Sequence, residues 1–379
     1  MTIRNMDAFF APRSVAFIGA SERPGTVGAV LMRNLIEAGF QGPIHPINPK
    51  HATIMGRTAY PSVAALPTPA DLAVIATPPA SIPGLVAELG RAGTCAVVVI
   101  TAGLGAAAQM GRTTLRQQML DAAQPHLTRI IGPNCLGIIM PHARLDASFG
   151  PTRVAPGRIA FVSQSGAMAT AVLDWAASRG IGFSSVLTLG DMADVDFGDS
   201  LDFLARDGRT RAILLYIEQV THARKFMSAA RAAARNIPVV VVKAGRFAEG
   251  ARAAASHTGA LAGSDAVYDA AIRRAGMVRV TELDELFEAV ETLSRMGVPC
   301  GERLAIVTNG GGAGVLATDA LIARKGRLAA LTDATITALD RHLPATWSHA
   351  NPVDIIGDAD AERYAATLEV VLAAPEVDA

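Results

Sequence analysis

The chain has 379 residues, of which 50% are hydrophobic and 18% are charged, and its 34 basic and 34 acidic side chains balance. This length and apolar content are sufficient for two to three domains with large cores. A net charge of zero gives no electrostatic reason to expect a nucleic acid or an anionic membrane as a partner.

The N-terminus and the cysteines predict a cytoplasmic protein without a resident metal. Residues 1–7 do not resemble a secretory signal. The longest uncharged run, 94–111, contains several glycines and is typical of a strand and loop rather than a membrane-spanning helix. Cys95, Cys135 and Cys300 are too far apart to match a metal-site spacing, so we expect reduced thiols.

Three similar segments, at 13–21, 158–166 and 303–311, recur at equal intervals along the chain. Each has a short run of Val, Ile and Ala, then a turn of small residues, then the start of a helical stretch. Strands that alternate with helices predict parallel sheets buried on both faces. The predicted fold class is α/β with three consecutive parallel-sheet domains, at 1–150, 151–298 and 299–379. Because the third is much shorter, we expect it to be incomplete in a longer protein.

The first domain is expected to be Rossmann-like, with strands at 14–19, 43–47, 72–76, 96–100 and 129–131. The loop after its first strand, 19–28, resembles a dinucleotide-binding fingerprint but is longer. The second strand ends in Asn48-Pro49-Lys50, where an NAD site would have an acidic residue; a lysine suits an extra phosphate, as in coenzyme A or NADP. The candidate cofactor-binding residues lie at strand ends and are Gly19, Ala20, Ser21, Arg23, Gly28, Asn48, Pro49, Lys50, Thr77, Pro78, Thr101, Ala102, Gly103 and Asn134.

The second domain begins with Ser163-Gln-Ser-Gly-Ala167, followed by a helix predicted over 168–179. The backbone N–H groups of Ser165, Gly166 and Ala167 would form a cradle for a phosphoryl group at the helix start. The alternative is an ordinary capped helix, with Ser163 or Ser165 as the N-cap.

Two further residues of this domain are candidates for catalysis. An apolar strand at 211–217 ends at Glu218, and a strand at 237–242 leads into a loop of small residues that contains His257. We hypothesise that His257 is a nucleophile that carries a phosphoryl group, and that Glu218 orients its imidazole. The alternatives are a loop histidine without chemistry and a solvated glutamate.

The third domain opens with Thr308-Asn-Gly-Gly-Gly-Ala-Gly314 and a helix predicted over 315–325. Three consecutive glycines, Gly310, Gly311 and Gly312, would be costly for structure alone, and close approach of the backbone to an anion would account for them. The segment Asn351–Asp354 would close the same crevice.

These motifs, in this order and over essentially the whole chain, resemble the nucleoside-diphosphate-forming acyl-CoA synthetases, the superfamily that includes succinyl-CoA synthetase. The resemblance implies a CoA-binding domain followed by two flavodoxin-like domains. It also implies that acid, CoA and ATP are interconverted with acyl-CoA, ADP and phosphate through an acyl phosphate and a phosphohistidine at His257. Glu218 would be its partner, and the cradles at 165–167 and 310–312 would face each other.

The same resemblance implies ATP/ADP binding with Mg²⁺ at an ATP-grasp domain, which lies outside these residues, either C-terminally or on a separate subunit. The expected partners are a small carboxylic acid, CoA and that ATP-grasp module, in a homo- or hetero-oligomer; the acyl group is left open. Two alternatives remain. One is the CoA-binding regulatory portion of a fused protein acetyltransferase, and the other is an NADP-dependent oxidoreductase, which leaves the two later cradles unexplained.

Overall fold

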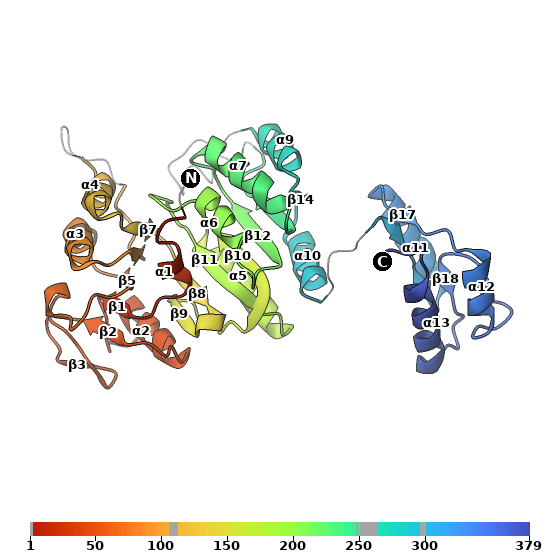
Figure 1. The fold of residues 1–379 in the computed structure, drawn as a ribbon, viewed down its shortest axis with the longest axis horizontal. Coiled ribbons are helices and arrows are strands. Elements are labelled where there is room, and N and C mark those ends of the chain that lie inside the picture. Colours follow the sequence, from red (N-terminus) through yellow and green to blue (C-terminus); the bar gives the residue numbers. More distant parts are fainter. Residues whose placement is uncertain (1–2, 106–112, 248, 251–263, 296–300) are drawn as a thin grey trace. The chain divides into compact units, whose positions relative to one another are not determined.

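The computed structural model describes residues 3–105, 113–247, 249–250, 264–295 and 301–379 (Figure 1). The chain forms two compact units, Met1–Arg295 and Met296–Ala379. Within the described ranges, no helix has the length and apolar character needed to cross a membrane.

The first sheet of unit 1 is fully parallel and has the strand order β2-β1-β5-β6-β7. The strands agree with those expected from the sequence: β1 (Val15–Ile18), β2 (Ile44–Ile47), β5 (Leu72–Ile75), β6 (Ala96–Val99) and β7 (Arg129–Ile131). The helices around it are α1 (Asp7–Phe10), α2 (Val27–Glu37), α3 (Ile82–Ala92) and α4 (Leu115–Ala123), and a small hairpin, β3 (Thr53–Ile54) and β4 (Arg57–Thr58), follows β2.

Alternation along each strand places side chains in two separate cores, because successive residues of a strand point to opposite faces. In β1, Val15 and Phe17 pack with α1 and α2, while Ala16 and Ile18 pack with α3 and α4. All four residues are buried. The continuous apolar runs therefore reflect a sheet that is covered on both faces.

The second sheet has the order β14-β13-β12-β10-β11-β8-β9. Five of its strands are parallel to one another: β10 (Pro156–Ser163), β11 (Phe183–Thr188), β12 (Ala212–Ile217), β13 (Val239–Lys243) and β14 (Val278–Val280). The hairpin β8 (Gly137–Met140) and β9 (Leu145–Ser148) extends it antiparallel to β11. This hairpin lies inside the range 1–150 that the sequence analysis assigned to the first domain, but it pairs with the second sheet.

Helices cover both faces of this sheet as well. One face packs against α5 (Gly166–Ser178) and α10 (Leu283–Arg295), and the other against α6 (Phe197–Leu204), α7 (Ala223–Ala234) and α9 (Asp265–Ala275). The second of these cores is continuous with the core under α1 and α2 of the first sheet. The two sheets of unit 1 therefore share one hydrophobic core.

A segment after β11 ties the two sheets together. The amides of Asp191, Ala193 and Val195 donate to the carbonyls of Pro133, Gly132 and Ile130 at 2.9, 3.0 and 3.0 Å. The guanidinium of Arg129 on β7 also pairs with Asp194 and Asp199 at 2.9 and 3.1 Å. These hydrogen bonds hold the segment 191–195 along the end of β7 and the turn that follows it, although the segment is not a strand of the first sheet.

Unit 2 is built from short elements around a small core of Leu339, Trp347, Val353, Ile355 and Val371. It contains α11 (Gly311–Ala323), α12 (Asp333–Asp340) and α13 (Ala361–Ala373), with the parallel pairs β15 (Arg303–Leu304) with β17 (Arg327–Leu328) and β16 (Val307–Thr308) with β18 (Val353–Asp354). The strand expected over 303–308 is thus divided in two and half-exposed. Each piece pairs with one short strand, and on the other edge of β15 the backbone of Asp378 and Ala379 makes hydrogen bonds with Arg303 and Ala305.

Candidate active site

The first sheet offers a cofactor site between β1 and β5, because the strand order reverses direction there and parallel sheets bind ligands at such points. Gly19 follows β1 with a φ of +99°, and a Cβ at this position would lie 2.6 Å from the carbonyl oxygen of Ala76. At Gly28, in the first turn of α2, a Cβ would lie 2.3 Å from the Gly19 oxygen. The two glycines therefore let the loop 19–28 approach both β5 and α2 closely.

A cavity of about 410 Å³ opens beside this point, and five of the predicted residues line it: Gly19, Asn48, Pro49, Thr77 and Pro78. The Asn48 amide is held from both ends, since Nδ2 donates to the Ala20 oxygen at 2.9 Å and Oδ1 accepts from the Lys50 amide at 2.8 Å. Lys50 is exposed at the end of this turn. Asn48 thus fixes the backbone at Lys50, and the role of the Lys50 side chain in binding a phosphate stays a prediction.

Other predicted cofactor residues support this loop without lining the cavity. Ala20 is buried, and the Ser21 hydroxyl accepts from the Arg23 amide at 3.0 Å. Gly103 has a φ of +87°, in the turn after β6. These contacts shape the turns that surround the site.

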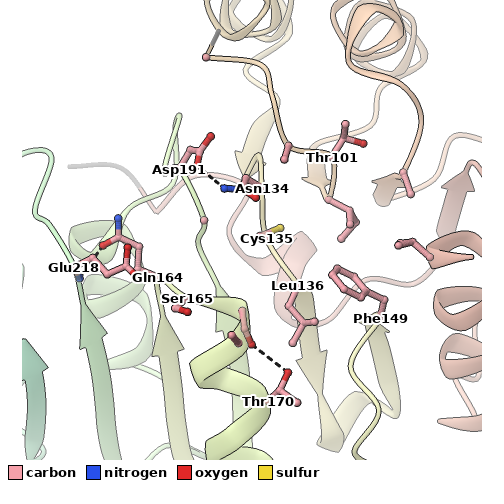
Figure 2. Close-up of a pocket in the computed structure, with 18 of the residues that line it drawn as sticks. Thr101, Asn134, Cys135, Leu136, Phe149, Gln164, Ser165, Thr170, Asp191 and Glu218 are labelled. Carbon is pink, nitrogen blue, oxygen red and sulfur yellow. Dashed lines mark hydrogen bonds between the residues drawn. The ribbon is translucent and has the colours of Figure 1, made fainter. Parts of the chain in front are cut away.

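A larger cavity of about 920 Å³ lies where the carboxyl ends of both sheets meet (Figure 2). From the first sheet it is lined by the predicted residues Thr101, Ala102 and Asn134. From the second sheet it is lined by the predicted residues Ser165, Gly166, Ala167 and Glu218. The structure therefore brings the sequence-predicted phosphate cradle, one catalytic candidate and part of the cofactor site into a single cavity.

The cradle is the N-terminus of α5, which begins at Gly166, two residues before the predicted start. Ser165 is the N-cap, and its hydroxyl accepts from the Met168 amide at 3.3 Å. The Ser163 hydroxyl accepts from the Ser165 amide at 3.1 Å and so fixes the turn. The capping that the sequence suggested is therefore present, and the remaining amides of the first turn open into the cavity as possible donors to an anion.

Gln164 is a residue of this site that the sequence analysis did not single out. Its side chain is 6% exposed, and its Oε1 accepts from two consecutive amides, those of Glu218 at 3.0 Å and Gln219 at 2.9 Å. Figure 2 shows its side chain directed at Glu218. Gln164 thus fixes the backbone from which the Glu218 carboxylate projects. Its place between two serines of the predicted cradle was the available signal.

Asp191 is a second residue that was missed. It follows Gly190, whose φ is +54° and at which a Cβ would lie 2.2 Å from the Asn134 oxygen. The Asp191 Oδ1 accepts from the Asn134 Nδ2 at 3.0 Å, as Figure 2 shows. The signal was a Gly-Asp pair directly after an apolar strand, which places a carboxylate at the carboxyl edge of a parallel sheet.

Cys135 also lines the cavity, but its thiol is not a nucleophile in this environment. The side chain is buried, and its Sγ donates to the Val99 oxygen at 3.3 Å. Burial raises the pKa of this thiol to about 12. It is therefore protonated at neutral pH.

His257 and Cys300, which the sequence analysis named, lie outside the described residues. Gly310 is the N-cap of α11 in unit 2, and Gly311 and Gly312 form its first turn, so this helix starts four residues earlier than predicted. The Asp354 carboxylate lies 3.0 Å from where a Cβ on Gly311 would be, so this helix start already has an acidic neighbour. That the two cradles face each other stays a prediction.

In the described part of the chain, no group of three acidic, histidine or cysteine side chains is arranged to hold a metal.

This fold and this cavity define a CoA-dependent ligase of the succinyl-CoA ligase type. Three family models match the chain in order: a CoA binding domain over residues 13–141, a succinyl-CoA ligase like flavodoxin domain over 156–293, and a ligase-CoA domain over 304–379.

Individual relatives are more specific. The chain is 42% identical over 378 residues to the alpha subunit of acetate–CoA ligase [ADP-forming] I of Pyrococcus furiosus, covering 98% of this chain and 81% of the relative. It is 43% identical to acetate–CoA ligase [ADP-forming] I of Archaeoglobus fulgidus, and there it spans 54% of the relative. The structure of acetyl-coenzyme A synthetase 1 from Candidatus Korarchaeum cryptofilum, in complex with phosphate and ADP, superimposes with a TM-score of 0.93 at 37% identity, covering 98% of this chain and 80% of that one. The protein belongs to the family of ADP-forming acyl-CoA synthetases, which are acid–thiol ligases.

Proposed function

We propose that this protein is the CoA-binding and phosphohistidine-carrying part of an ADP-forming acyl-CoA synthetase. With an ATP-grasp partner it interconverts a carboxylic acid, CoA and ATP with acyl-CoA, ADP and phosphate. The observation that carries this proposal is the cavity of about 920 Å³, which joins the cofactor edge of the first sheet to the α5 N-terminus and Glu218.

Coenzyme A binds along the carboxyl edge of the first sheet. Its adenosine part occupies the smaller cavity beside Gly19 and Thr77, and Lys50 pairs with the 3′-phosphate. The pantetheine arm then passes Thr101 and ends near Asn134 in the larger cavity. This direction follows from the sheet order, since β5, β6 and β7 lead from the smaller cavity toward the second sheet.

The phosphoryl group of an acyl phosphate rests at the start of α5. Directed amides at a helix N-terminus favour an anion, and the helix dipole adds about 0.3–1 kcal/mol. Phosphoryl transfer depends mainly on positioning and charge stabilisation, so amides around a small-residue turn are suited to it.

His257 accepts this phosphoryl group and carries it to ADP, which the ATP-grasp partner binds with Mg²⁺. The chain leaves β13 at Lys243 and returns at α9, and β13 pairs directly with β12, which ends beside Glu218. The Glu218 carboxylate can accept a hydrogen bond from one imidazole nitrogen and leave the other free to attack phosphorus. Gln164 keeps Glu218 in place for this role.

The acid is a monocarboxylic acid, and acetate is the first to test. Named relatives act on acetate, 4-hydroxybutyrate and, as a feruloyl-CoA synthase, an aromatic acid. Among the described residues that line the larger cavity, Arg116 is the sole basic one, and its guanidinium donates to the Met192 oxygen at 3.3 Å. This guanidinium keeps further N–H donors, so succinate is the dicarboxylic acid to compare with acetate in the same assay.

Labelling with radioactive phosphate tests the proposal without the ATP-grasp partner. The protein, incubated with acetyl-CoA and radiolabelled inorganic phosphate, should acquire an acid-labile, base-stable label, and His257→Ala should acquire none. A His257→Ala protein that labels as well as the wild type would remove His257 from the mechanism. If the wild type binds CoA but stays unlabelled, the CoA-binding regulatory function is favoured instead.

A further inference from the structure

We propose that Asp191 is the catalytic base that takes the proton from the thiol of coenzyme A. This inference rests on the proposed function and adds to it the group that activates the attacking sulfur. It also assigns to the second sheet, rather than to the CoA-binding sheet, the residue that acts on the cofactor's reactive end.

The position of Asp191 is fixed by its backbone. Its amide donates to the Pro133 oxygen at 2.9 Å, and the Asn134 amide donates to the Thr101 oxygen at 3.0 Å. The loop after β7 and the loop after β11 are thereby held together at the edge where the pantetheine arm would end. Gly190 permits this contact, since any side chain there would collide with the backbone of Pro133 and Asn134.

One oxygen of the Asp191 carboxylate is held by a hydrogen bond, and the other is available to accept a proton. Oδ1 accepts from the Asn134 Nδ2 at 3.0 Å, and Oδ2 makes no hydrogen bond with another residue that the structure describes. Asp191 is only partly buried and lines the larger cavity. A carboxylate held by an amide on one oxygen can accept a proton on the other without moving.

The two carboxylates that line the described part of this cavity are Asp191 and Glu218. The two carboxylates lie at different strands. Glu218 follows β12, which pairs with β13, whereas Asp191 follows β11 and contacts the first sheet through Asn134. Figure 2 shows Asp191 beside Asn134, and Glu218 beside Gln164. Glu218 lies where it can orient the histidine, which leaves Asp191 as the carboxylate placed to accept the proton of the thiol.

A free thiol has a pKa of about 8.5, so it is mostly protonated at neutral pH and attacks slowly. Asp191 takes the S–H proton while sulfur attacks the carbonyl carbon of the acyl phosphate. The carbon–sulfur bond forms, the bond between carbon and the bridging oxygen breaks, and phosphate leaves. Asp191 then releases its proton to the departing phosphate. In the reverse direction, protonated Asp191 donates to the CoA thiolate.

Two half-reactions of the purified protein separate this step from the phosphoryl transfer. Phosphate-labelled acetyl phosphate should phosphorylate His257 without involving a thiol, whereas unlabelled acetyl phosphate and CoA should yield acetyl-CoA. Asp191→Asn should leave the histidine labelling unchanged and slow thioester formation by about 100-fold at neutral pH, within the usual contribution of a general base. The deficit should shrink as the pH rises and the thiol ionises by itself, near a pKa of about 8.5.

Asp174→Asn, which removes an exposed carboxylate from α5, is the matched control and should behave as the wild type in both reactions. If Asp191 had a purely structural role, Asp191→Asn and Asn134→Ala would slow both half-reactions alike, with no recovery at high pH. That result would overturn the inference. Thioester formation by Asp191→Asn at the wild-type rate would overturn it too. A wild-type protein that neither labels nor forms thioester would instead refute the proposed function.

Discussion

Replacing Gln164 by methionine tests how the site is held together. Methionine has nearly the same length, but it cannot accept hydrogen bonds from the amides of Glu218 and Gln219, now at 3.0 and 2.9 Å from Oε1. Each lost hydrogen bond costs about 1 kcal/mol. Because the site borders an open cavity, water can reach the two amides, and we expect a loss of about 2 kcal/mol in the free energy of unfolding rather than the larger penalty of a dry interior.

Tryptophan fluorescence during urea unfolding measures this loss. Trp175 lies on α5 in unit 1, and Trp347 lies in the core of unit 2. A Trp347→Phe background leaves Trp175 to report on unit 1 alone, which avoids mixing two unfolding transitions. Gln124→Met, at an exposed position, is the control and should not shift the midpoint.

The same variant should lose phosphorylation of His257 while keeping its affinity for CoA. A shift of about 1 Å in a positioned group costs on the order of 100-fold in rate, and Gln164 contacts the Glu218 backbone but not the cavity of the first sheet. If Gln164→Met is as stable and as readily labelled as the wild type, the positioning role is wrong.

Two further predictions concern pH and the cofactor. Asp146 is 8% exposed, and burial raises the pKa of its carboxyl to about 6 from an ordinary 3.8. The folded state therefore holds this proton more tightly than the unfolded state, and the resulting stability is complete below about pH 4 and lost as the pH rises through 6. Asp146→Asn keeps an oxygen that accepts from the Ser148 amide and hydroxyl. The variant should match the stability of the wild type near pH 4 and exceed it by up to about 3 kcal/mol at pH 7. Equal urea midpoints of variant and wild type at both pH values would contradict this. Lys50→Ala should weaken binding of CoA more than binding of dephospho-CoA in calorimetric titrations, and equal losses would show that Lys50 does not contact the 3′-phosphate.

Much of the fold could be predicted from the sequence, because the signals are local. All five strands expected in the first domain are present, and each of their apolar runs is buried on both faces of the sheet. The predicted start of α5 lies two residues from the observed one, because its signal, a serine N-cap followed by a glycine, is carried by adjacent residues. Residues 165–167 and Glu218 were chosen from strand ends, which meet at one edge in a parallel sheet, and they line one cavity. Their roles stay a prediction.

Where the prediction differed, distant partners decided the outcome. The hairpin 137–148 follows the last strand of the first sheet, yet it pairs with β11 of the second sheet. The strand expected over 303–308 divides, because its two halves pair with different strands, β17 and β18. Sequence periodicity indicates which residues favour a strand, but it does not identify the neighbouring strand that completes their hydrogen bonds.

Local chemistry therefore determined the strands, the glycine turns, the helix caps and the family to which the chain belongs. Only the tertiary structure revealed Gln164 and Asp191, because their roles depend on residues 54 and 57 positions away, Glu218 and Asn134. The residues beside each one marked a possible site, but they did not indicate which distant group its side chain would contact. The contact of Gln164 with Glu218 needs β10 and β12 to pair within the second sheet. The contact of Asp191 with Asn134 needs both sheets to bring their carboxyl ends to one cavity.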